Sequence, residues 1–123
     1  MKFFKCSHCS NIIAFMEDKG VPVMCCGQKM EEIIPGSVDA AAEKHVPVIS
    51  FMDDKVFIDV GDVAHPMTEE HHIAWIVLET QNGFQKKDLD VTHEPQAVFT
   101  LSEDSAVAAY AYCNLHGLWM AEA

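Results

Sequence analysis

Four cysteines near the start of the chain constrain its fold more than any other feature. They are spaced as Cys6-x2-Cys9-x15-Cys25-Cys26, and the 36-residue segment that holds them cannot bury enough apolar surface to fold on hydrophobic burial alone. Four thiolates with these chelate loops suit a tetrahedral site for iron or zinc. The sequence therefore predicts a metal-bound domain over residues 1–36, which ends at the turn-rich joint around Pro35 and Gly36.

The adjacent pair Cys25-Cys26 requires a bend in the backbone. Consecutive side chains of an extended chain point to opposite faces, so both thiols reach one metal only where the chain kinks, and Gly27 supplies that freedom. Inert or disulfide-bonded cysteines are the alternative. Five cysteines are an odd number, and an odd count with a vicinal pair favours metal ligation in a reducing compartment.

The charge excludes several classes of partner. The chain carries a net charge of −11, and its 8 basic residues are all lysines. Nucleic acid and anionic membranes both need clustered cationic contacts, so we expect neither as a partner. The apolar runs Ile73–Leu78 and Ala106–Cys113 are far shorter than the ~20 residues that span a bilayer, and the first residues lack the apolar stretch of a signal peptide. We expect a cytoplasmic protein.

Residues 37–123 are expected to form a second, mainly β domain. Short strands without intervening helices favour an antiparallel, immunoglobulin-like β-sandwich. Gln81-Asn82-Gly83 predicts a hairpin with a type I′ turn, because Asn-Gly accepts two positive φ values. Asp39–Lys44 allows one helical turn. The extended segments that we expect are Phe3–Ile13, Val21–Met24, Val46–Met52, Lys55–Val60, Ile73–Thr80, Gly83–Lys87, Ala97–Leu101 and Ala106–Tyr112.

This second domain contains most of the histidines and the fifth cysteine. Imidazole and thiolate together favour Fe, Cu, Ni or Zn over Mg or Ca. Any single histidine is more often solvated or hydrogen-bonded in a core, so the hypothesis of a metal site depends on the group. The segments concerned are Glu43-Lys44-His45-Val46-Pro47, His65-Pro66-Met67, His71-His72-Ile73-Ala74-Trp75-Ile76 and Cys113-Asn114-Leu115-His116-Gly117.

By spacing and context these segments resemble the catalytic domain of superoxide reductases, the desulfoferrodoxin and neelaredoxin family. The cysteine pattern is similar to the desulforedoxin-like domain of the same family, so the resemblance covers nearly the whole chain. It implies two iron ions per chain, with zinc as an alternative at Cys6, Cys9, Cys25 and Cys26. For the second iron it implies equatorial histidines, an axial thiolate and an open sixth position, with the ligands His45, His65, His71, His116 and Cys113.

The sequence also leads to expectations for one histidine ligand and for Ser10. The six-residue step from His65 favours His71 as the ligand, and the adjacent His72 is the alternative. Relatives usually carry glycine directly after the second cysteine, where this chain has Ser10. A residue other than glycine with positive φ costs roughly 1 kcal/mol there.

The resemblance also implies an activity, which is one-electron reduction of superoxide to hydrogen peroxide. Lys44 is expected to attract superoxide and to support the water that protonates the product. Glu43 is expected to occupy the sixth position in the oxidised resting state. By composition alone, this pair would be an exposed Glu-Lys on a surface turn. The electron would come from a donor such as rubredoxin or from the iron held by the four N-terminal cysteines, and the family tends to form homodimers.

Two other functions compete with this interpretation. Cys113-x2-His116-x3-Met120 is reminiscent of the copper-binding loop of a cupredoxin-like electron carrier, but this reading leaves His65 and His71 unused. A zinc-ribbon binding module would explain the four N-terminal cysteines and nothing else. A metal count separates the three hypotheses, as two irons, one copper or one zinc per chain.

Overall fold

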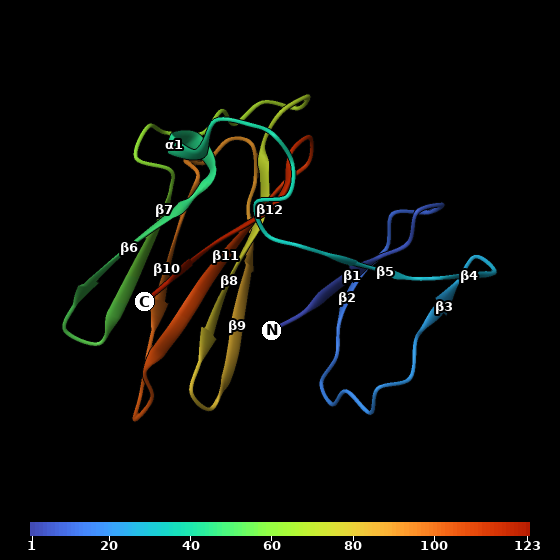
Figure 1. The fold of residues 1–123 in the computed structure, drawn as a ribbon. Helices are drawn as coiled ribbons and strands as arrows, with labels where there is room; N and C mark the ends of the chain where they lie inside the picture. Colours follow the sequence, from blue (N-terminus) through green and yellow to red (C-terminus); the bar gives the residue numbers. More distant parts are fainter. The chain divides into compact units, whose positions relative to one another are not determined.

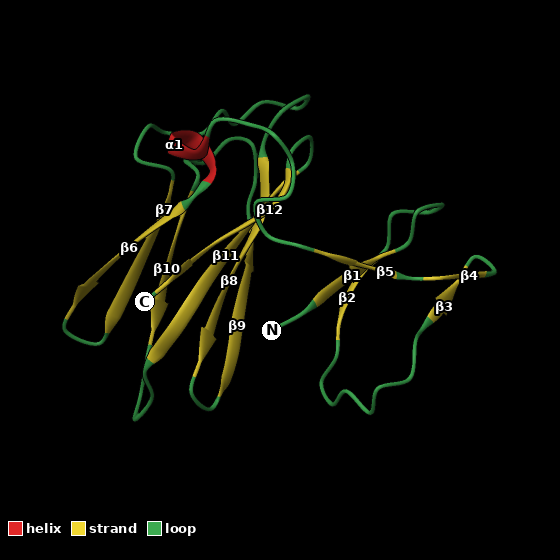
Figure 2. Cartoon of the chain, viewed as in Figure 1, coloured by secondary structure: helices red, strands yellow, loops and turns green.

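The computed structural model describes residues 1–123, and they divide into two compact units, Met1–Ile34 and Pro35–Ala123. We call the first unit the head and the second the body. Nearly all of the regular structure is β (Figure 2), which confirms the predicted fold class. None of its helices has the length and apolar character needed to span a bilayer.

The head consists of very short strands. In its three-stranded antiparallel sheet β1 lies between β2 and β5, and β3 pairs with β4. The predicted single segment Phe3–Ile13 is wrong, because the chain turns after Cys6, where the Ser10 amide donates to the Cys6 carbonyl at 3.0 Å. The strands are β1 (Phe3–Lys5), β2 (Ile12–Ala14), β3 (Met24–Cys25), β4 (Gln28–Lys29) and β5 (Glu31–Ile33).

The body is an antiparallel sandwich of two sheets with strand orders β10-β7-β6 and β12-β11-β8-β9 (Figure 1). All six predicted strands are present to within about a residue at each end. The last strand was not predicted, because Met, Ala and Glu give it little β propensity; pairing with β11 along its whole length makes it a strand. The elements are α1 (Ala42–His45), β6 (Pro47–Met52), β7 (Lys55–Val60), β8 (Ile73–Thr80), β9 (Gly83–Asp88), β10 (Gln96–Thr100), β11 (Ala106–Cys113) and β12 (Gly117–Glu122).

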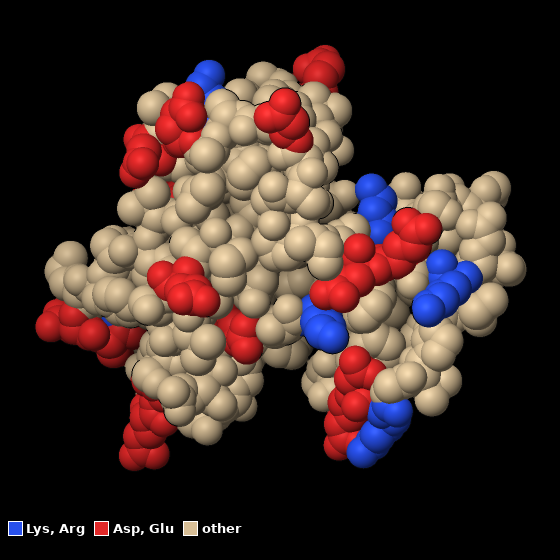
Figure 3. Space-filling view, viewed as in Figure 1, with Lys and Arg blue, Asp and Glu red and all other residues tan.

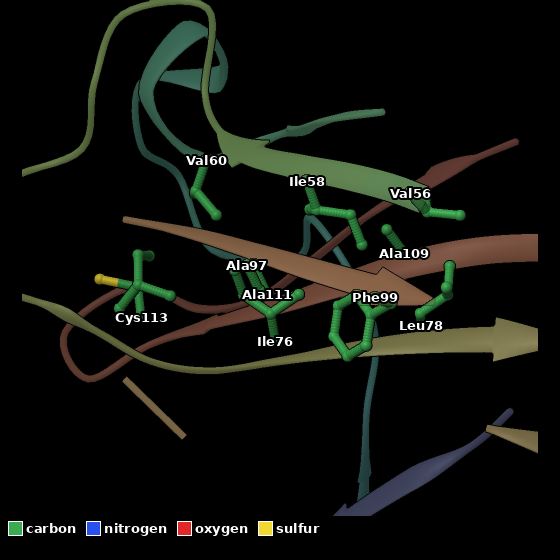
Figure 4. Packing of buried hydrophobic residues seen from close by; sticks show 11 residues of the cluster. Val56, Ile58, Val60, Ile76, Leu78, Ala97, Phe99, Ala109, Ala111 and Cys113 are labelled. Atoms are coloured by element: carbon green, nitrogen blue, oxygen red, sulfur yellow. The ribbon is translucent and has the colours of Figure 1, made fainter. Parts of the chain in front are cut away.

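The core of the body lies between the two sheets and follows the period of two expected for strands. Ile58 of β7, Ile76 of β8 and Phe99 of β10 are fully buried, and the small Ala109 and Ala111 of β11 leave room for them (Figure 4). Burial of each large side chain contributes about 1.5–3 kcal/mol. Cys113 belongs to the same cluster and lies at one end of it (Figure 4).

Side chains join the two sheets where β9 and β10 form their edges. The Gln85 amide donates to the Thr100 carbonyl at 3.0 Å, and the Lys87 ammonium donates to the Val98 carbonyl. The same ammonium lies 5.4 Å from the centre of the Phe99 ring, within the range of a cation–π contact. Carbonyl groups that an edge strand would otherwise leave unpaired are therefore satisfied.

The hairpin between β8 and β9 is present, but its predicted turn type is wrong. Gly83 pairs with Thr80 in the ladder, so the loop is Gln81-Asn82, and neither Asn82 nor Gly83 has a positive φ. Contacts with the β10–β11 loop hold this turn: Ser105 accepts from the Gln81 amide at 3.0 Å, and Asp104 accepts from the Asn82 amide at 3.2 Å.

The pairing of the strands brings several chain segments together at one end of the sandwich. Pro47 at the start of β6 pairs with Val60 at the end of β7, and Cys113 at the end of β11 pairs with Ile73 and Gly117. The predicted helical turn lies at the same end (Figure 1). It ends at His45, because the residue before Pro47 is disfavoured in helical conformation.

Candidate metal centres

Four imidazole rings form a square at this end of the body. Ring centroids of neighbours lie 4.6 Å apart for His45 and His65, 4.5 Å for His65 and His71, 5.0 Å for His71 and His116, and 4.9 Å for His116 and His45. Neighbouring rings are close to perpendicular, whereas His45 and His71 face each other across the square at 6.2 Å with an interplanar angle of 31°. The four rings thus surround one common point.

The four histidines and Cys113 come from three separate segments of the chain. His45 ends α1, and His65 and His71 belong to the loop between β7 and β8. Cys113 ends β11, and His116 lies in the following loop. Donor atoms of His45, His65, His71 and Cys113 all lie within 4.8 Å of one another, and His116 Nδ1 is 3.1 Å from His45 Nε2 and 3.8 Å from Cys113 Sγ.

Backbone carbonyl groups fix the orientation of two rings. His45 Nδ1 lies 2.7 Å from the Ala41 oxygen, and His65 Nδ1 lies 2.7 Å from the Pro66 oxygen. Each Nδ1 therefore carries the proton and donates it, so the Nε2 lone pairs point into the square. The two Nε2 atoms are only 3.2 Å apart, a distance at which their lone pairs repel unless a cation or a proton lies beside them.

The environment of the rings fits a bound metal ion. His71 Nε2 is buried and has no hydrogen-bond partner within the protein, a costly arrangement that coordination would relieve. Burial lowers the pKa of His45 and His71 and brings that of His65 to about 4, so these rings are neutral near pH 7. Neutral imidazoles beside a thiol are a donor set for Fe, Cu, Ni or Zn.

Asn114 joins the two loops that carry His71, Cys113 and His116. Its side-chain oxygen accepts from the His72 amide at 2.9 Å, and its Nδ2 donates to the Glu70 carbonyl at 3.0 Å. Its own amide donates to the His72 carbonyl at 3.1 Å. Asn114 was not predicted as a site residue, although it lies inside the Cys113–Gly117 motif.

Trp119 contacts two of the four histidines. Its ring centroid lies 4.9 Å from that of His45 at an interplanar angle of 34°, and its indole N–H donates to the His116 carbonyl at 3.1 Å. Trp119 pairs with Ala111 of the core face. Nothing in the sequence pattern indicated this role, because an aromatic residue in a strand is most often part of the core.

The remaining histidine and methionine candidates lie outside the group. His72 Nδ1 faces the Thr68 carbonyl at 2.9 Å, so it is the adjacent His71 that the structure brings into the square. Met120, the weak copper ligand of the cupredoxin hypothesis, pairs with Tyr110. Because neighbouring residues of a strand point to opposite faces, Met120 lies on the face opposite to Trp119 and away from Cys113.

Glu43 and Lys44 directly precede His45 in α1, and both side chains are exposed. Acidic side chains outnumber lysines on the face of the body seen in Figure 3, and they are scattered rather than gathered in one patch. Lys44 therefore places a positive charge next to the square within a generally acidic domain.

The four head cysteines also form one group, with all sulfur atoms within 4.8 Å of one another. Cys9 Sγ and Cys25 Sγ are 3.6 Å apart. The predicted bend is present: β3 and β4 are joined by Cys26 and Gly27, whose φ values of 52° and 73° are the two positive angles that a type I′ turn requires. Ser10 has the positive φ expected at its position, 67°.

Protonation of the head cysteines shows why the group needs a cation. Backbone amides of Cys9 and His8 donate to the Cys6 sulfur and lower its pKa to about 6. Hydrogen bonds to the thiols of Cys9 and Cys6 raise the pKa of Cys26 to about 12. Without a metal the four sulfurs cannot all be thiolates at neutral pH, whereas coordination deprotonates them together.

Comparison with known proteins gives consistent matches. The sequence model of the desulfoferrodoxin family matches residues 37–122. A desulfoferrodoxin homologue of Archaeoglobus fulgidus is 43% identical over 97% of this chain and 94% of its own length. The desulfoferrodoxin of Nitratidesulfovibrio vulgaris is 43% identical over 99% and 96%. The crystal structure of the superoxide reductase from Treponema pallidum superposes with a TM-score of 0.83 at 39% identity and covers 98% of both chains.

Proposed function

The chain belongs to the desulfoferrodoxin family, and from that premise we propose that it is a superoxide reductase. The reaction adds one electron and two protons to each superoxide, gives one hydrogen peroxide and releases no O2. One observation carries the proposal: four imidazoles surround a common point beside the buried thiol of Cys113, and the buried His71 Nε2 has no partner within the protein.

The ligands of the catalytic iron are His45, His65, His71, His116 and Cys113. The bound iron supplies the single electron that superoxide takes up. Hydrogen bonds from Nδ1 to the Ala41 and Pro66 carbonyls keep two rings turned toward the centre before the metal arrives. With iron bound, the Cys113 thiolate would donate electron density to it and so favour transfer of an electron to superoxide. The sulfur is completely buried, which keeps water away from it.

Lys44 and Glu43 are the catalytic residues beside the iron ligands. The Lys44 ammonium attracts superoxide over short range and holds the water that protonates the product. A local charge is needed because the protein carries −11 overall, and charges beyond about 8 Å are largely screened at physiological ionic strength. With iron bound, the Glu43 carboxylate would occupy the substrate position in the oxidised resting state.

The head cysteines hold a second metal, which is iron, with zinc as the alternative. The electron would return to the catalytic centre from an external donor such as rubredoxin or from a head iron. None of the five cysteines forms a disulfide, which fits a reducing compartment such as the cytoplasm. Exposed apolar side chains of the head, Met16, Val21 and Met24, support pairing of two chains as a homodimer.

Metal analysis combined with product measurement tests the proposed function. We expect two iron ions per chain, with one hydrogen peroxide formed for each superoxide consumed and no O2 released. One copper per chain would support the cupredoxin hypothesis, and zinc in the head alone would support the zinc-ribbon hypothesis. Formation of O2 with one peroxide for every two superoxides would identify a dismutase and contradict the proposal.

The role of Lys44 can be tested by Lys44→Ala. Loss of the ammonium should slow the reaction with superoxide roughly tenfold and weaken its ionic-strength dependence, because local electrostatic attraction is removed. The iron content should not change. Lys55→Ala is a matched control, since Lys55 lies at the opposite end of β7 and pairs with Asp54. Unaltered kinetics of Lys44→Ala would refute its role.

A further inference from the structure

Gly61, which directly follows β7, lies closer to the Glu43–Lys44 backbone than any side chain would allow. Its φ is +84°, and a Cβ at this position would lie 2.3 Å from the Glu43 carbonyl oxygen and 2.6 Å from the Lys44 Cα. Gly36 also has a positive φ, +72°, yet a Cβ there would meet nothing within 4 Å. Glycine is therefore needed at position 61 for the contact itself and not only for the turn.

The turn that contains Gly61 is firmly attached to the body. The Val60 amide donates to the Pro95 carbonyl at 2.8 Å, and the His65 amide donates to the Val60 carbonyl at 3.0 Å. Between these two bonds the Val63 amide donates to the Glu43 carbonyl at 2.9 Å. The contact is thus made by backbone atoms on both sides and has little freedom to slide.

The segment on the other side of the contact has little stability of its own. The helix α1 covers four residues, and no side-chain hydrogen bond caps its start at Ala41. A single helical turn is unfavourable without tertiary support, because the first turn fixes many torsions for one hydrogen bond. The position of the Lys44 backbone therefore depends on what packs against it.

We propose that Gly61 and Val63 are positioning residues for Lys44. Gly61 sets how closely the Glu43–Lys44 backbone approaches β7, and the Val63 amide holds the Glu43 carbonyl in place. Together they determine where the exposed Lys44 ammonium stands relative to the square of histidines. The inference rests on the proposed reduction of superoxide and on the role of Lys44 in it.

The first test is Gly61→Ala in the full-length, iron-loaded protein. We expect an unchanged iron content and visible spectrum, with a reaction with superoxide slowed on the order of tenfold, because small displacements of a reacting group are costly. Gly36→Ala is the matched control: it introduces a side chain at positive φ without a contact and should leave the rate unchanged.

A double variant separates positioning from a general loss of structure. If Gly61 acts through Lys44, adding Gly61→Ala to Lys44→Ala should cause no further decrease in rate, and the ionic-strength dependence should already be weak in Gly61→Ala alone. An equal decrease in both backgrounds would overturn the inference, because Gly61 would then act independently of Lys44.

Val63→Pro keeps the inference testable if Gly61→Ala loses iron or does not fold. Proline removes the amide that donates to Glu43, whereas the control Val63→Ala retains it. We expect Val63→Pro to slow the reaction and this decrease to disappear in the Lys44→Ala background. Val63→Pro with the unaltered rate, or loss of iron in both variants, would overturn the inference.

The same measurements distinguish this inference from the proposed function. An unaltered protein that does not reduce superoxide contradicts both. An unaltered protein that does so, with a slow Lys44→Ala variant and no coupling between Lys44 and either positioning residue, contradicts only the inference.

Discussion

The head and the body build their metal groups in opposite ways. In the head the group lies on turns and at the end of β3, among strands of only two or three residues, and two of its four cysteines, Cys9 and Cys26, are exposed. In the body the group lies at the end of strands of up to eight residues, and Cys113 is itself part of the core cluster. Apolar side chains of the head remain exposed, as shown by Met16 with an exposed fraction of 84%, whereas Cys113 in the core of the body is 0% exposed.

This difference indicates whether the fold of each unit depends on its metal or its metal site depends on the fold. The head buries few side chains, so its fold must rely on the bonds between its cysteines and a metal. The body has a continuous core of buried side chains, so we expect it to fold without metal and to bring the ligands together. The fold of the head therefore depends on its metal site, whereas the fold of the body assembles the ligands of its metal site.

Removal of metal should have the largest effect and should separate the two units. A structural site with four ligands contributes on the order of 10 kcal/mol to folding, so a chelator should unfold residues 1–34 while residues 35–123 remain folded. Amide chemical-shift dispersion, measured by NMR before and after chelation, reports on both units at once. A head that stays folded without metal would contradict the comparison.

Cys113→Ser should remove the chemistry of the body without unfolding it. The hydroxyl is a poor substitute for a thiolate ligand, so the sulfur-to-ferric absorption band of the body iron and most of the reductase activity should disappear, while the bands of a head iron remain. The cost to stability should be about 1–3 kcal/mol, because a polar group is buried. Cys9→Ser, which alters only the head, is the control and should retain that band; an unchanged spectrum in Cys113→Ser would refute the axial assignment.

Asn114→Ala should have an intermediate effect, because it loosens the body site without removing a ligand. Loss of its side-chain hydrogen bonds to the His72 amide and the Glu70 carbonyl should lower iron affinity about 10–100-fold. Iron retention against a competing chelator measures this change. Asn82→Ala, in the exposed loop between β8 and β9, should retain iron as the unaltered protein does. Equal retention of iron by the two variants would show that the site does not need the hydrogen bonds of the Asn114 side chain.

Ser10→Gly should have the smallest effect, and it acts on the head. Glycine relieves the positive φ of 67°, which should stabilise the metal-bound head by about 1 kcal/mol or less, since glycine also loses more chain entropy on folding. The guanidinium midpoint for unfolding of the head measures this gain. Ser10→Ala removes the hydroxyl but keeps the strained angle, so a similar gain in this variant would contradict the explanation.

The parts of the fold that could be predicted from the sequence are those with a local cause. Lys55–Val60 and Ile73–Thr80 are rich in β-branched residues, and the structure has strands with these bounds. The last strand, Gly117–Glu122, forms only through pairing with β11, and the β8–β9 turn is set by contacts with Asp104 and Ser105. These contacts involve residues that are far apart in the sequence, so the local sequence contains no pattern that predicts them.

The same distinction applies to the site. The spacing of the cysteines indicated the head group, whereas the resemblance to superoxide reductases implied the histidines and Cys113 that the structure places together. Asn114, Trp119 and Gly61 were missed, because each acts through a contact with a residue far away in the sequence. A lone glycine after a strand indicates a turn; only the approach of Glu43 shows why no other residue fits there.

All of the chemistry of the body gathers at one end of the sandwich, and this leaves the other end free for engineering. The connections there are Asp53-Asp54, Gln81-Asn82 and the segment from Leu101 to Ser105, and none of them carries a member of the square. Exposed loop tips are where inserted sequences are best tolerated. A peptide tag or an electrode linker attached at Asp53-Asp54 would therefore be separated from the square of histidines by the full length of the strands.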